Sequence, residues 1–177
     1  ISTIEAKLGG VDILVNNAAI DIPNIFSKKN VNDFRKTLDV NLVGAFLTSK
    51  RAEKHILDKK WGRIINISST NGMNTYYPMG IEYDASKAAL NSLTHNLAIE
   101  FAPYATVNAI APGFYAAEQN HALLFNEDGT YTDRARKIVA GTPMGRFGNP
   151  EELIGAALFL ASDDAAGFVN GIVLPVD

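Results

Sequence analysis

The 177-residue chain contains no cysteine, which excludes disulfide bonds, thiol catalysis and thiolate metal sites. Its three histidines, His55, His95 and His121, lie far apart and lack metal-ligand spacing, so we expect no metal site. The net charge is −3 without a basic block, which argues against nucleic acid or an anionic membrane as partner. No apolar run reaches the length of a membrane span, and no segment reads as a signal peptide. These absences predict a cytoplasmic location.

The hydrophobic content of 47% suits one globular domain over residues 1–177. Short β-branched runs alternate with helical patterns, which predicts an α/β fold with a parallel sheet. The strands are expected at 11–15, 63–68, 106–110 and 169–176, the last broken by Gly171. Helices are expected from 31, after an Asn30 cap, to about 58, over 83–101, and from Pro150, after an Asn149 cap, to about 161.

Small and polar residues follow three of these strands, at the edge where doubly wound sheets bind ligands. They are Asn16-Asn17-Ala18-Ala19, Ser68-Ser69-Thr70 and Ala111-Pro112-Gly113. Small alanine side chains allow a flat ring to approach the backbone. The alternative is a set of ordinary turns.

Tyr83 and Lys87 lie one helical turn apart and share a face. An ammonium about 4 Å from a phenol favours the phenolate by roughly 4 kcal/mol at an effective dielectric of about 20, or about three pKa units, before desolvation opposes the shift. Such a tyrosine could exchange protons with an alcohol or a carbonyl. Alternatively, the tyrosine only packs while the lysine extends to solvent.

Two further features have open interpretations. Asn41, in mid-helix among apolar neighbours, is either functional or a satisfied helix-packing amide. Residues 114–148, weakly helical around 133–139, form either a lid or substrate loop or an ordinary surface insertion.

Taken together, these motifs resemble the short-chain dehydrogenases/reductases along essentially the whole chain. Asn16 to Ala19 resemble the family's NNAG motif, and Pro112-Gly113 matches its PG motif. The family's catalytic tetrad is matched in order by Asn41, Ser69, Tyr83 and Lys87. The resemblance implies a Rossmann-like doubly wound parallel sheet that here lacks the family's first three strands.

The resemblance also implies reversible hydride transfer between NAD or NADP and a secondary alcohol or ketone, in a homo-oligomer (dimer or tetramer). Tyr83 would be the general acid/base, Ser69 would hydrogen-bond the substrate oxygen, and Lys87 would lower the Tyr83 pKa and hold the nicotinamide ribose. Asn41 would anchor a water that relays protons to Lys87. Ser68 is the rival of Ser69, because only one of the two can face the substrate.

The remaining implied contacts are with the cofactor. Its nicotinamide side would be bordered by Asn17, Ala18, Ala19, Pro112 and Gly113, with Tyr83 and Lys87.

A finer likeness is to the sugar-acid branch, such as D-mannonate oxidoreductases (fructuronate reductases). It rests on residues 112–120, 131–134 and 142–148. Polar groups near the Pro-Gly loop would suit a polyhydroxylated acid as the small-molecule substrate. Arg146 could clamp its carboxylate, but a structural or interface role is favoured because an arginine often precedes this helix in the family.

The family's glycine-rich first turn, which binds the adenosine and pyrophosphate, has no counterpart in these residues. We therefore expect an incomplete record of a longer enzyme, with 11–15 as an exposed apolar edge strand prone to aggregation. The alternative is a non-catalytic binding or scaffold protein, or a fragment without activity.

Overall fold

The computed structural model describes residues 2–75 and 79–177. Their strands form one parallel sheet in the order β1-β2-β3-β4. The strands are β1 (Ile13–Asn16), β2 (Gly62–Ile67), β3 (Ala105–Pro112) and β4 (Val173–Val176). Each of the four predicted strands is found, although the last is shorter than expected and starts beyond Gly171, whose φ is 77°. The α/β class with a parallel sheet is confirmed.

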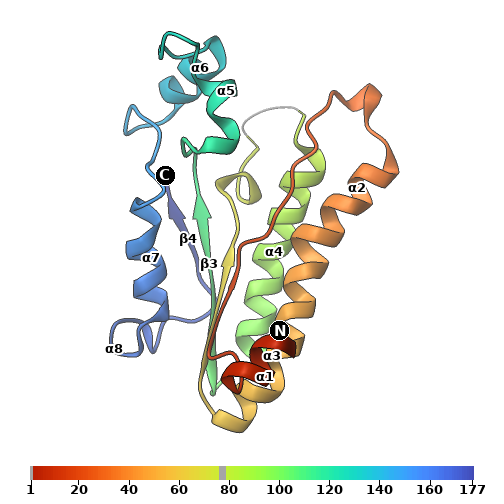
Figure 1. Ribbon diagram of the computed structural model, residues 1–177, viewed down its shortest axis with the longest axis vertical. Coiled ribbons are helices and arrows are strands. Elements are labelled where there is room, and N and C mark those ends of the chain that lie inside the picture. Colours follow the sequence, from red (N-terminus) through yellow and green to blue (C-terminus); the bar gives the residue numbers. More distant parts are fainter. Residues whose placement is uncertain (1, 76–78) are drawn as a thin grey trace.

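Helices cover both faces of this sheet, because neighbouring side chains on a strand point in opposite directions. Ile64 packs with α3 (Gly44–Lys59) and α4 (Ile81–Glu100) in one apolar cluster. Ile65 packs with Leu160 of α7 (Glu152–Ala161) in another. Figure 1 shows α7 on one side of the strands and α3 and α4 on the other. This layering is the doubly wound arrangement that the sequence predicted.

The long helix predicted from residue 31 is present but is not uniform. It consists of α2 (Val31–Leu38), a π-helical turn η2 (Asp39–Val43) and α3. Asn30 caps it as expected, since its side chain accepts a hydrogen bond from the Asp33 amide at 2.9 Å. The π turn contains Asn41, and such turns often occur at functional sites. Hydrophobic spacing alone did not predict this interruption.

The start predicted for α7 is wrong. The helix begins at Glu152, not at Pro150, and no Asn149 side-chain cap is seen. The Glu152 carboxylate instead accepts a hydrogen bond from the Asn149 amide at 2.8 Å and pairs with Arg146 through two 2.7 Å contacts. These bonds support the structural role preferred for Arg146.

Residues 114–148 fold into a unit that we call the cap. It contains η4 (Glu118–Asn120), α5 (His121–Leu124) and α6 (Asp133–Gly141). It has its own buried apolar cluster, formed by Leu124, Ala135, Ile138 and Phe147. Figure 1 shows α5 and α6 beyond the carboxyl end of β3. The cap is therefore a packed structure over the ligand edge of the sheet, not a loose insertion.

The remaining elements are short, namely α1 (Ser2–Leu8), η1 (Phe26–Lys28), η3 (Thr70–Gly72) and α8 (Asp163–Ala166). Residues 76–78, in the segment between η3 and α4, lie outside the described residues. In the described part of the chain, β1 has β2 as its one partner, and its Ile13 and Val15 are 44% and 48% exposed. The exposed apolar edge is thus confirmed, while the aggregation expected from it stays a prediction.

Candidate active site

A cavity of about 620 Å³ lies between the carboxyl end of the sheet and the cap. Ser69 follows β2, Tyr83 lies in the first turn of α4, and Gly113 follows β3. All three line this cavity, so the fold joins residues that three separate motifs supply. The cap contributes the opposite wall from η4, α5 and α6.

Tyr83 and Ser69 both line this cavity, and the Ser69 hydroxyl influences the pKa of the Tyr83 phenol. Burial raises the pKa of the Tyr83 phenol, while a side-chain hydrogen bond with Ser69 opposes that rise. Tyr83 is therefore protonated at neutral pH, and its hydroxyl lies beside a second hydroxyl. Two adjacent hydroxyls suit a substrate oxygen that gains or loses a proton.

The structure separates the two rival serines. Ser68 is buried, and its hydroxyl donates to the Asn91 amide oxygen at 2.5 Å, so it joins β2 to α4. The Ser69 side chain faces the cavity, where its oxygen accepts a hydrogen bond from the Asn71 amide at 3.2 Å. Geometry therefore favours Ser69 for contact with a substrate.

Lys87 is buried beneath Tyr83. Its Nζ donates to the Ile67 carbonyl at 2.7 Å and lies 5.6 Å from the centroid of the Tyr83 ring. Burial lowers the pKa of Lys87 to about 8. The expected lowering of the Tyr83 pKa by Lys87 is wrong in this structure, because desolvation of the phenol dominates and the lysine is itself desolvated.

Asn41 acts on the loop after β1. Its Oδ1 accepts from the Ile20 amide at 2.7 Å, and its Nδ2 donates to the Ile20 carbonyl and the Ser86 hydroxyl, both at 2.9 Å. Both amide protons are thus used within the protein. The side chain fixes the loop against α4, which is a positioning role, and the water relay stays a prediction.

Of the other predicted site residues, some line the cavity and others do not. Asn17, Ala18 and Ala19 are exposed after β1 and do not line the cavity. Pro112 ends β3, and Gly113 lines the cavity. A Cβ at Gly113 would lie 1.8 Å from Oδ1 of Asp177, so a larger residue there requires the Asp177 side chain to move.

These residues fit the nicotinamide half of a dinucleotide. After its bond to Ile67, the Lys87 ammonium keeps two protons for ribose hydroxyls. Asn17 to Ala19 offer exposed backbone and small side chains at the same edge of the sheet. Among the described residues, no group of three acidic or histidine side chains could hold a metal ion, and no helix could cross a membrane.

Sequence reasoning missed two sets of polar contacts. Asn16 donates to the Asn66 side chain at 2.8 Å, which ties β1 to β2 below the site. Lys29 pairs with the buried Glu82 at 2.5 Å and holds the segment after β1 against α4. Partners that lie so far apart in the sequence can be identified only once the fold is known. The sequence did show polar residues within apolar strands, and such residues need a hydrogen-bond partner when they are buried.

The whole chain, residues 1–177, matches the family model described as enoyl-(acyl carrier protein) reductase. It is 39% identical over 178 residues to the 5-keto-D-gluconate 5-reductase of Escherichia coli K12, covering 98% of this chain and 66% of the relative. The chain therefore belongs to the short-chain dehydrogenases/reductases, a family of NAD(P)-dependent oxidoreductases. The predicted family, enzyme class and cofactor class are confirmed at this level.

Solved structures give the same result. The gluconate 5-dehydrogenase of Burkholderia cenocepacia, in complex with NADP and tartrate, matches with a TM-score of 0.88 and 36% identity. The alignment covers 99% of this chain and 67% of that one. A Haemophilus protein provisionally assigned as a D-mannonate oxidoreductase, with bound NAD, has a TM-score of 0.88 and 39% identity, covering 99% and 69%. This chain thus spans about two thirds of the length of its relatives.

Proposed function

We propose that this protein interconverts a secondary alcohol and a ketone on a polyhydroxylated sugar acid, with NAD or NADP as cofactor. The observation that carries the proposal is the presence of two hydroxyl side chains, Tyr83 and Ser69, in the lining of one large cavity. Support for the substrate class comes from the relatives named for gluconate derivatives.

Tyr83 is the general acid/base of this proposal. In ketone reduction its phenol donates a proton to the carbonyl oxygen, and in alcohol oxidation its phenolate takes the hydroxyl proton. Ser69 donates a hydrogen bond to the same oxygen as charge develops there. When bound, the nicotinamide supplies or accepts the hydride.

The other residues prepare this site. Lys87 holds the ribose side of the cofactor with its two remaining ammonium protons. Asn41 keeps the loop after β1 in place, so that Asn17, Ala18 and Ala19 border the nicotinamide together with Pro112 and Gly113.

The experiment is a substrate panel with the purified protein and each cofactor. Sugar acids such as D-gluconate and D-mannonate are compared with a 3-oxoacyl thioester, the substrate type in the name of a relative from Synechocystis that is 38% identical to this chain. We expect turnover of at least one sugar acid or its keto form. Turnover of the thioester alone would contradict the proposal, and failure to bind any nicotinamide would favour a scaffold protein.

The two serines give a matched pair of variants. Ser69→Ala removes a donor to the developing charge, so kcat should fall about 10²- to 10³-fold with little change in melting temperature. Ser68→Ala removes the hydroxyl that donates to the Asn91 side chain at 2.5 Å. The free energy of unfolding should therefore fall by about 1–3 kcal/mol, with a smaller change in kcat than in Ser69→Ala. Kinetics and thermal melts check both, and the reverse pattern would assign the role to Ser68.

The two directions of the reaction should depend oppositely on pH. Because the Tyr83 pKa is raised, the phenol stays protonated at neutral pH and oxidation is limited by the scarce phenolate. Oxidation should therefore accelerate from about pH 7 to 10. Reduction consumes the proton of the phenol, so its rate should fall as pH rises toward the raised pKa of Tyr83. Initial rates in both directions test this, and an oxidation rate that falls with pH would contradict it.

A homo-oligomer also remains part of this proposal. Apolar side chains are exposed on α3, where Phe46 is 45% and Leu47 59% accessible. An apolar surface of this kind suits a contact between subunits.

A further inference from the structure

The charged residues of α6 are divided between two sides of the helix. Arg134 and Lys137, three positions apart, line the cavity together with Ile138. Asp133 and Arg136 pair with each other at 2.5 Å and do not line it. Because of this helical spacing, Arg134 and Lys137 line the cavity of the proposed substrate, while Arg136 lies outside it.

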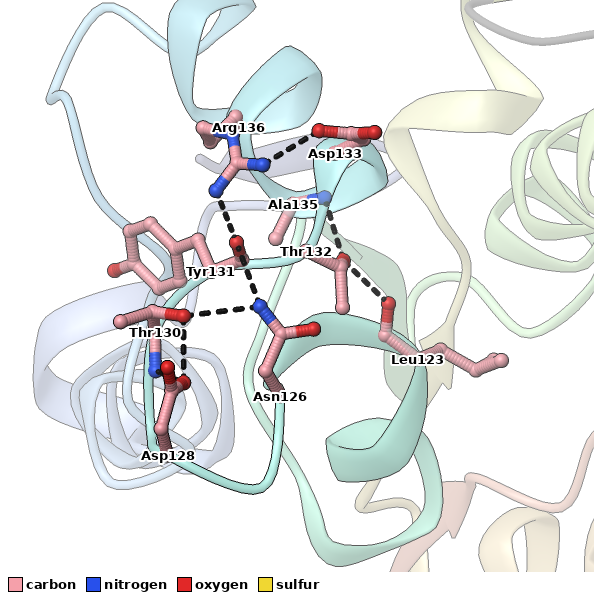
Figure 2. Close-up of polar contacts among 9 residues, drawn as sticks. All are labelled: Leu123, Asn126, Asp128, Thr130, Tyr131, Thr132, Asp133, Ala135 and Arg136. Atoms are coloured by element: carbon pink, nitrogen blue, oxygen red, sulfur yellow. Dashed lines mark hydrogen bonds and ion pairs between the residues drawn. The ribbon is translucent and has the colours of Figure 1, made fainter.

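The position of α6 is fixed by contacts outside the cavity. Figure 2 shows Thr132, which accepts a hydrogen bond from the Ala135 amide at 3.2 Å and donates to the Leu123 carbonyl at 2.9 Å. Ala135 and Ile138 are fully buried in the apolar cluster of the cap. The two cations are therefore presented by a packed and capped helix, not by a free loop.

Neither cation is neutralised by a direct ion pair. The described residues contain nine ion pairs, and none involves Arg134 or Lys137. By contrast, Arg136 and Arg146 each have a carboxylate partner. Within the described part of the chain, Arg134 and Lys137 thus line the cavity without a carboxylate side chain in direct contact with either of them.

Among the described residues that line the same cavity, Asp21 is the one acidic side chain. Burial raises the pKa of its carboxyl, and the charges of Lys29 and, to a smaller extent, Arg134 oppose that rise, which places Arg134 within electrostatic reach of Asp21. The lining therefore carries two positive charges and one negative one. A ligand with a carboxylate balances this set, and its hydroxyls can donate to Asp21.

We infer that Arg134 and Lys137 bind the carboxylate of the substrate, while Tyr83 and Ser69 act on a carbon further along its chain. This inference rests on the proposed function and names the residues that select acids over neutral polyols. It also assigns the acid-binding role to α6 instead of Arg146, which is held by Glu152.

The test compares D-gluconate with D-glucitol, which has a hydroxymethyl group in place of the carboxylate. Arg134→Gln, Lys137→Gln and the double variant are measured beside Arg136→Gln, a control that removes one charge from the outer side of α6. For the double variant, we expect kcat/KM for gluconate to fall about 10- to 100-fold, mainly through KM. For glucitol it should change less than about 2-fold, because no carboxylate contact is lost.

Direct calorimetric titration of gluconate separates this inference from the proposed function. If the protein turns over neither compound but binds gluconate, and the double variant loses that binding, the inference stands and the proposed function fails. Equal losses for gluconate and glucitol, an equal loss in Arg136→Gln, or absence of gluconate binding to the unaltered protein would each overturn the inference.

Discussion

Tyr83→Phe should lower kcat about 10²- to 10⁴-fold in both directions, because the variant has no group to exchange a proton with the substrate oxygen. The ring itself remains, and so do its packing and its contact with Lys87. The melting temperature and cofactor binding should therefore stay close to those of the unaltered protein. Steady-state kinetics, thermal melts and a nicotinamide titration together measure this.

Tyr115→Phe is the matched control. Tyr115 also lines the cavity, but its hydroxyl donates to the Val176 carbonyl at 3.0 Å and so belongs to the structure. Its removal should cost about 0.5–1.5 kcal/mol of stability and leave kcat within a few-fold. Near-normal turnover in Tyr83→Phe, or an equal loss in both variants, would contradict the role given to Tyr83.

Gly72→Ala should damage both the fold and the reaction. A Cβ at this position would lie 2.7 Å from the backbone carbon of Lys87 and 2.9 Å from its oxygen. Backbone atoms inside a helix cannot move aside easily, so the loop that carries Ser69 must shift away from Tyr83. We expect a loss of about 1–3 kcal/mol in the free energy of unfolding. The rate should fall at least 10-fold, since even small displacements of reacting groups are costly.

Gly155→Ala provides the opposite case. Gly155 lies within α7, and a Cβ there would meet no atom within 4 Å. Alanine is the better helix former, so stability should rise by about 0.5–1 kcal/mol with an unchanged rate. Denaturant unfolding and kinetics test both variants. If Gly72→Ala were as stable and active as Gly155→Ala, the close packing of the Ser69 loop on α4 would be refuted.

The strands and the long helices could be predicted because their signals are local. Runs such as Val11 to Val15 and the spacing of Tyr83 and Lys87 depend only on neighbouring residues. The sequence also predicted that Ser69 and Pro112-Gly113 lie at one edge of the sheet, since the carboxyl ends of parallel strands meet there.

What could not be predicted depends on burial and on distant partners. The direction of the Tyr83 pKa shift follows from desolvation, which sequence spacing does not reveal. The choice between Ser68 and Ser69 required the position of Asn91 on α4. The start of α7 lies two residues later than predicted because residues 149–152 form a tight turn with i→i+3 hydrogen bonds. In this turn the Glu152 carboxylate, also paired with Arg146, accepts from the Asn149 amide, whereas the predicted side-chain cap from Asn149 is missing.

The most direct test of the central claim is the absorbance of reduced nicotinamide when the protein is mixed with a sugar acid and NAD or NADP at alkaline pH. We expect reduced nicotinamide to form with at least one acid and to nearly disappear in Tyr83→Phe under the same conditions. Formation that persists undiminished in that variant, or none with any acid although the protein binds acid and cofactor, would show that Tyr83 does not catalyse this reaction.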